Sequence, residues 1–330
     1  MESGGRRYWY FDTAKEGGGK NRRYVGPVDD EEISRRVERF KDIKADNRAR
    51  RKIVSTLVRE AYLPKPDPMA GDIVNALATA GFFRLRGVLV GTVAFQCYSA
   101  LLGVRLPNTA MQTSDADFAQ FHSISVAVGD TISPVLGILK QIDETFREIP
   151  HQADGRYTTQ YVTRSGYKVE FLTPNTGTDD YTGHPSPMPA LGGASAQPLR
   201  FLDFLIHQSV RAVILHGAGI PVRVPAPERF AVHKLIVASR RLTDDDGTAK
   251  SRKDRQQAVT LMIAMIELRQ RETLVDAYME AWERGPAWRE AIQASMKMLD
   301  ADVERRLRDE LSAGVTALEG RPSEYGLRDT

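Results

Sequence analysis

The chain has 330 residues, 42% hydrophobic and 27% charged, which is typical of a globular protein with a substantial core. One cysteine excludes a disulfide framework, and neither a signal-peptide pattern nor a run of about 20 apolar residues is found, so we expect a cytoplasmic protein without a membrane partner. The net charge of +3 is uneven, because residues 1–65 hold 17 Lys and Arg against 11 Asp and Glu. This basic segment predicts a polyanionic partner, nucleic acid first, although a solvated charged helix would have the same composition.

We expect three parts: a basic hairpin and long helix over 1–67, a mixed α/β core over 68–225, and a C-terminal helical domain over 226–330. In the first part, aromatic and basic residues at 8–11 and 22–27 surround a glycine turn, which indicates a β-hairpin. An aspartate at 29 or 30 is expected to cap the helix that follows. Prolines at 64, 66 and 68 mark its end.

The central part is predicted to alternate short helices with the strands of a mixed sheet. Helices are expected at 73–80, 93–102 and 132–146. Strands are expected at 83–90, 117–121, 124–128, 156–164, 167–172, 201–206, 212–215 and 222–224. The stretch 174–198 is rich in Pro, Gly, Ser and Thr and is expected to be a long loop, and long loops in compact domains often have a functional role.

Helical periodicity takes over after Pro227. Helices are predicted over 229–242 and 252–269, followed by two more that separate near Gly285, and the last few residues are expected to be disordered. The whole is therefore of the α+β (mixed α/β) class.

Two aspartates spaced two residues apart, Asp115 and Asp117, lie in a strand pattern, where a period of two puts both side chains on one face. A third acid, Glu170, lies in an apolar strand pattern, where an unpaired carboxylate would be costly to bury. Magnesium prefers oxygen ligands and usually takes one or two carboxylates plus substrate phosphates. An Asp-x-Asp motif alone is common by chance, but three acids on neighbouring strands predict a two-metal site.

A strand that runs into Gly91-Thr92 and then into a helix offers free backbone N–H groups to an anion, although it is also an ordinary tight turn. Lys234 lies on a largely apolar helix, where it must either bind an anion such as a triphosphate or reach the helix surface. His233 beside it is interpreted as a packed histidine.

These motifs, in this order, resemble the polymerase-β-like nucleotidyltransferase superfamily, and within it a poorly characterised bacterial group of nucleotidyltransferase-fold proteins. The resemblance rests on residues 23–27, 90–92, 113–119, 168–174, 224–235 and 253–254. It implies a nucleotidyltransferase-fold mixed sheet with flanking helices, and makes 68–225 the catalytic core. The catalytic and metal-binding residues that it implies are Asp115, Asp117 and Glu170. The nucleotide-binding residues that it implies are Gly91, Thr92, Ser114 and Lys234.

The function implied by the resemblance is transfer of an NMP group from an NTP to an acceptor, with two Mg²⁺ ions, or Mn²⁺ in their place. The basic N-terminal segment favours nucleic acid (RNA, tRNA or DNA) as that acceptor. Two alternatives stay open: a catalytically inactive nucleotidyltransferase-fold protein that binds nucleic acid or regulates, and a toxin-like enzyme that nucleotidylates proteins. The sequence identifies neither the preferred NTP nor the oligomeric state.

Overall fold

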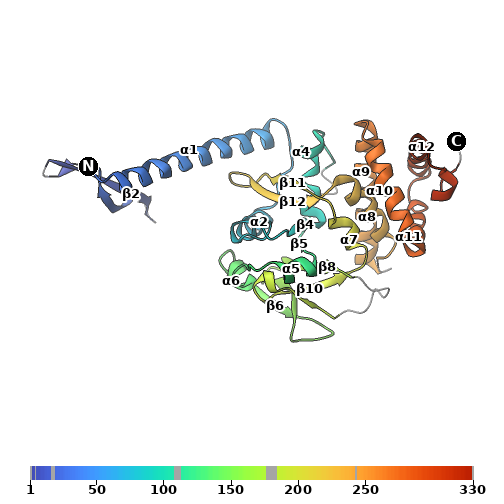
Figure 1. The fold of residues 1–330 in the computed structure, drawn as a ribbon, viewed down its shortest axis with the longest axis horizontal. Helices are drawn as coiled ribbons and strands as arrows, with labels where there is room; N and C mark the ends of the chain where they lie inside the picture. The colour runs from blue at the N-terminus through green and yellow to red at the C-terminus, as the bar shows by residue number, and fades with distance from the viewer. Residues whose placement is uncertain are drawn as a thin grey trace. The chain divides into compact units, whose positions relative to one another are not determined.

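The computed structural model describes residues 2–3, 5–15, 19–107, 113–175, 184–241 and 244–328 (Figure 1). The chain divides into two compact units. The first comprises residues 1–60 and 217–219, and the second comprises residues 61–216 and 220–330.

The first unit contains a small antiparallel sheet and one long helix, as the sequence predicts. Its elements are β1 (Glu2–Ser3), β2 (Arg6–Ala14), β3 (Lys20–Pro27) and α1 (Glu31–Arg59). The helix begins after Asp30, whose carboxylate accepts a hydrogen bond of 2.9 Å from the backbone N–H of Ile33. No residue of α1 is buried, so the helix is held mainly by its own backbone and by the hairpin.

Within the described residues, seven strands of the second unit form a mixed sheet. They are β4 (Val88–Val90), β5 (Asp115–Ala119), β6 (Arg147–Pro150), β7 (Thr158–Val162), β8 (Lys168–Pro174), β9 (Ser186–Pro187) and β10 (Ser195–Leu199). The order β4-β5-β8-β10-β9 places β8 between two parallel neighbours, β5 and β10. The hairpin partner β7 pairs antiparallel with β8 and carries β6 on its other edge.

Helices and a separate strand pair surround this sheet (Figure 1). The strand pair is β11 (Ser209–Ile214) and β12 (Ile220–Pro225). The helices before the C-terminal part are α2 (Pro68–Ala80), α3 (Gly91–Phe95), α4 (Tyr98–Leu102), α5 (His122–Ala127), α6 (Val135–Lys140) and α7 (Leu202–Ile206). The C-terminal helices are α8 (Pro227–Ala238), α9 (Asp245–Glu267), α10 (Arg271–Glu283), α11 (Pro286–Met296) and α12 (Ala301–Ala317).

One apolar cluster runs from α2 through the sheet to the C-terminal helices and ends at Leu327. The predicted mixed α/β class, with helices flanking a mixed sheet, is therefore confirmed. None of the described helices combines the length and the apolar character that a membrane span requires.

Two predicted strands are helices. The run 201–206 is apolar almost throughout, and such a run fits a buried strand and a buried helix equally well. The structure has the helix α7 there, buried on most sides. The alternation of Ile124, Val126 and Val128 favours a strand, yet Val126 is 59% exposed and α5 forms instead. Alternation predicts a strand only where a neighbouring strand exists to pair with it.

Other boundaries are wrong in extent. Of the strand expected at 83–90 only β4 forms, and of the helix expected at 132–146 only α6 forms. The helix expected at 93–102 is broken into α3 and α4. The predicted loop 174–198 contains β9 and β10, whereas its residues 176–183 lie outside the described part.

The strands expected at 212–215 and 222–224 form a pair of their own and do not join the mixed sheet. Among the described residues three helices, not two, follow α9. Within the described residues, which end at 328, the last segment forms a short 3-10 helix, η3 (Pro322–Tyr325), before the buried Leu327, and residues 329–330 of the expected disordered end lie outside the described part.

Candidate active site

The three predicted acids lie on the two central strands of the mixed sheet. Asp117 of β5 is the direct register partner of Glu170 on the parallel strand β8. Because side chains alternate along a strand, Asp115 and Asp117 lie on the same face of β5. Phe118 lies on the opposite face, where it stacks at 5.7 Å on its register partner Phe171, and both rings are fully buried. The aromatic core on one face thus fixes the alignment of the acids on the other.

The three carboxylates differ in their partners. The hydroxyl of Thr113 donates a hydrogen bond to Asp115, and Nε2 of Gln160 donates one of 2.8 Å to Oε1 of Glu170. Asp117 has no hydrogen-bond or ion-pair partner within the described residues. Burial, together with the negative charges of Asp115 and Glu170, raises the pKa of Asp117 to about 7. Burial also raises the pKa of Glu170 above its ordinary value.

As they stand, the side chains are not gathered around a common point. In the part of the chain that the structure describes, no three His, Cys, Asp or Glu side chains lie close enough together to hold a metal ion. The donor set nevertheless fits a hard divalent cation, because it consists of carboxylate oxygens only and includes Asp117, which has no partner in the described part of the chain. A cation beside Asp117 would offset the repulsion and desolvation that raise its pKa.

Gly91 directly follows β4 and lies against Asp117. Its φ is +67°, and a Cβ added there would lie 2.3 Å from Oδ2 of Asp117, so both the backbone and the carboxylate require a glycine. Thr92 is buried, and its hydroxyl accepts a hydrogen bond of 3.4 Å from Nε2 of Gln257 on α9. Ser114 is exposed, immediately before β5. Of the three predicted nucleotide-binding residues in this region, Gly91 is the one that lines the pocket beside Asp117.

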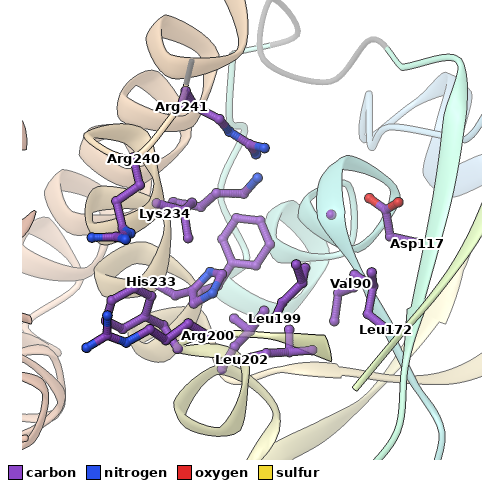
Figure 2. Close-up of a pocket in the computed structure, with 15 residues that line it drawn as sticks. Val90, Asp117, Leu172, Leu199, Arg200, Leu202, His233, Lys234, Arg240 and Arg241 are labelled. Carbon is purple, nitrogen blue, oxygen red and sulfur yellow. The ribbon is translucent and has the colours of Figure 1, made fainter. Parts of the chain in front are cut away.

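A pocket of about 380 Å³ opens beside Gly91 and Asp117 (Figure 2). Its basic lining residues are Arg200, Lys234, Arg240 and Arg241. Its apolar lining residues are Val90, Leu172, Leu199, Phe201, Leu202, Leu205, Phe230 and Val237. Figure 2 shows Lys234 and Arg241 on the wall opposite Asp117, so a cationic wall and a carboxylate face each other across the pocket.

Lys234 and Arg241 share one buried carboxylate. Nζ of Lys234 lies 2.6 Å from Oδ1 of Asp254, and Nε of Arg241 donates to Oδ2 at 2.8 Å. Burial alone would raise the pKa of Asp254, but the two cations outweigh it and hold that pKa below its ordinary value. The patterns singled out Lys234 and assigned no role to Arg241 or Asp254. A usable signal was that Asp254 shares the apolar helical stripe of Ala258 and Leu261 on α9.

His233 also lines the pocket and is 8% exposed. Its Nδ1 has no hydrogen-bond partner among the described residues. Burial, and then the positive charge of Lys234, lower the pKa of His233 to about 3, so the ring is neutral. It is a packed histidine, as interpreted from the sequence, but one that borders the candidate site.

Comparisons with known proteins bear on the family of the chain. A family model described as Nucleotidyltransferase matches residues 68–283. Comparison with curated proteins gives no match. A solved structure of an antigenic nucleotidyltransferase-like protein from Paracoccidioides brasiliensis is 14% identical to this chain, with a TM-score of 0.28, over 65% of this chain and 94% of the other. The family match spans β4, both acidic strands and the helices that carry Lys234 and Asp254, and the chain therefore belongs to this nucleotidyltransferase family.

Proposed function

We propose that the protein is a cytoplasmic, magnesium-dependent nucleotidyltransferase that moves the NMP group of an NTP onto a nucleic-acid acceptor. The observation that carries this proposal is the position of Asp117 at the edge of a pocket with a basic opposite wall. Asp117 is in register with Glu170 and has no hydrogen-bond or ion-pair partner among the described residues. Carboxylates on one side and cations on the other suit a metal-bound polyphosphate better than a neutral or purely anionic ligand.

Asp115, Asp117 and Glu170 would hold the metal. Two Mg²⁺ ions, or Mn²⁺, would supply charge neutralisation on the phosphates and polarise the acceptor oxygen. In the transfer, the acceptor oxygen bonds to the α-phosphorus while the bond to the leaving pyrophosphate breaks. Lys234 and Arg241 lie across the pocket from Asp117, where they would meet the negative charge that leaves with pyrophosphate.

Asp254 prepares this wall in the absence of substrate. It holds Lys234 and Arg241 in place through short contacts, so the two flexible side chains are already ordered when a phosphate enters. The pocket volume lies in the range of small-molecule sites, and its apolar half around Leu199 and Phe201 offers a surface to a nucleoside. Gly91 leaves room for the Asp117 carboxylate beside the backbone.

The basic N-terminal segment supports nucleic acid as the acceptor. Residues 1–65 carry an excess of six positive charges, and this excess favours a polyanion. An inactive nucleic-acid-binding protein and a protein-modifying enzyme would share much of this site, so the assay must separate them.

The test is incubation with each α-labelled NTP, Mg²⁺ and total RNA, tRNA, single-stranded DNA or protein extract. We expect label on nucleic acid, and loss of about a thousandfold or more in Asp115→Asn and in Asp117→Asn. Asp276→Asn is the matched control, because Asp276 is an exposed aspartate on α10. NTP binding without transfer to any acceptor would establish the inactive protein, and label on protein alone would establish protein nucleotidylation.

A further inference from the structure

The aromatic residues of the N-terminal hairpin lie on two faces, one of which packs on α1. Nε1 of Trp9 donates a hydrogen bond of 2.9 Å to Oγ of Ser34. Nζ of Lys41 lies 4.2 Å from the centre of the Trp9 ring. Two residues further along β2, the ring of Phe11 meets Phe40 edge-on at 5.4 Å. Trp9 and Phe11 therefore attach the hairpin to the helix.

The opposite face carries three tyrosines, Tyr8, Tyr10 and Tyr24, which we call the tyrosine face. The Tyr24 ring lies 5.8 Å from the Tyr8 ring and 5.8 Å from the Tyr10 ring. Tyr24 is 60% exposed and Tyr10 is 38% exposed. Packing on α1 does not explain this cluster, because alternation along β2 turns Tyr8 and Tyr10 away from the Trp9 side.

Basic residues accompany the tyrosine face. The Arg22 guanidinium lies 6.0 Å from the centre of the Tyr10 ring and pairs with Asp12. That pair is exposed, so it contributes little to stability and can exchange Asp12 for another anion. Arg6 lies two residues before Tyr8 on the same strand and is also exposed.

We propose that the tyrosine face is a stacking platform for the unpaired bases of a single-stranded nucleic acid. Aromatic rings stack on bases of any identity, and neighbouring arginines hold the backbone. In a duplex the base faces are covered by their neighbours, so the platform selects single strands. The excess of positive charge in this part of the chain favours a polyanion over an apolar partner or a second copy. The inference deepens the acceptor proposed above and rests on it, but it needs no catalysis.

The test uses the full chain in EDTA without NTP, with fluorescence anisotropy of a labelled 16-nucleotide uridine strand and of a duplex of equal length. We expect the single strand to bind at least tenfold tighter than the duplex. Tyr24→Ser should weaken single-strand binding about tenfold, and Tyr10→Ser/Tyr24→Ser should weaken it further. Tyr62→Ser is the matched control, because Tyr62 is 65% exposed and also lies beside an arginine, Arg105.

The salt dependence separates stacking from charge. In Tyr24→Ser the slope of log K against log salt should stay at the wild-type value, whereas Arg22→Ser should reduce it. Unchanged circular dichroism would show that the exposed substitutions leave the fold intact.

Equal affinity for single strand and duplex, or a Tyr24→Ser variant that binds like the wild type, would overturn the proposal. A variant that alters sedimentation of the protein but not nucleic-acid binding would also overturn it, in favour of a contact between copies. Asp117→Asn leaves the tyrosine face unchanged. Single-strand binding by this variant, without NMP transfer, therefore tests the stacking platform separately from the proposed catalysis.

Discussion

Replacing Gly91 by alanine should couple energetically to Asp117, and the size of the coupling follows from the geometry. At a φ of +67° an alanine costs roughly 1–2 kcal/mol of backbone strain. Its Cβ would lie 2.3 Å from Oδ2 of Asp117, so the carboxylate must move, at an overpacking cost of about 1–3 kcal/mol. Gly91→Ala should therefore destabilise the protein by about 2–5 kcal/mol.

The Asp117→Ala background isolates the second contribution. There the carboxylate is gone, and the remaining Cβ of residue 117 is 3.4 Å away, an ordinary contact. Gly91→Ala should then cost only the strain of roughly 1–2 kcal/mol. Urea unfolding of the four proteins of this double-mutant cycle, in EDTA, measures the difference. Additivity within about 0.5 kcal/mol would refute the close approach of Gly91 to the Asp117 carboxylate.

Three further predictions concern the basic wall of the pocket, its buried histidine and the core behind the acids. Asp254→Asn should destabilise the protein by about 3 kcal/mol in urea unfolding, because Lys234 and Arg241 lose the charge of a carboxylate that is only 4% exposed. A change below about 1 kcal/mol would contradict a buried ion-pair network. The pKa of His233 is about 3 in the folded protein and 6.5 in the unfolded chain. The neutral ring therefore contributes stability above pH 6.5, and this contribution is lost as the pH falls toward 3. Between pH 8 and pH 5 the free energy of unfolding of the wild type should fall by about 2 kcal/mol more than that of His233→Asn. If the two free energies of unfolding change in parallel with pH, His233 has an ordinary pKa in the folded protein. Phe118→Ala should cost about 4 kcal/mol, and thermal unfolding indistinguishable from wild type would argue against the stacked core behind the acids.

The sequence predicted best those features that local chemistry determines. Asp30 caps α1, and the helix expected at 73–80 does end at Ala80, because Gly81 follows in the left-handed conformation that glycine favours, with a φ of +101°. The spacing of Asp115 and Asp117 placed both on one face of a strand. The strands expected at 156–164 and 167–172 are found as β7 and β8, which pair with each other.

What the sequence did not indicate depends on tertiary packing. The apolar run of α7 is compatible with either element, and only its surroundings make it a helix. Strand β10 is short and includes Pro198, but β8 supplies a parallel partner some 20 residues earlier in the chain. The contact between Lys234 and Asp254 joins two helices, and no spacing rule connects residues across a loop.

The register of β5 on β8 has a consequence for how such a chain can change in length. One extra residue inside β5 would turn Asp117 to the aromatic face and bring an apolar side chain to the pocket, because a shift by one residue exchanges the faces. An extra residue in the turn at 151–157, between β6 and β7, leaves the pairing of Asp117 with Glu170 untouched. We therefore expect insertions and deletions among relatives to gather in turns such as 151–157, whereas the five residues of β5 keep a constant length.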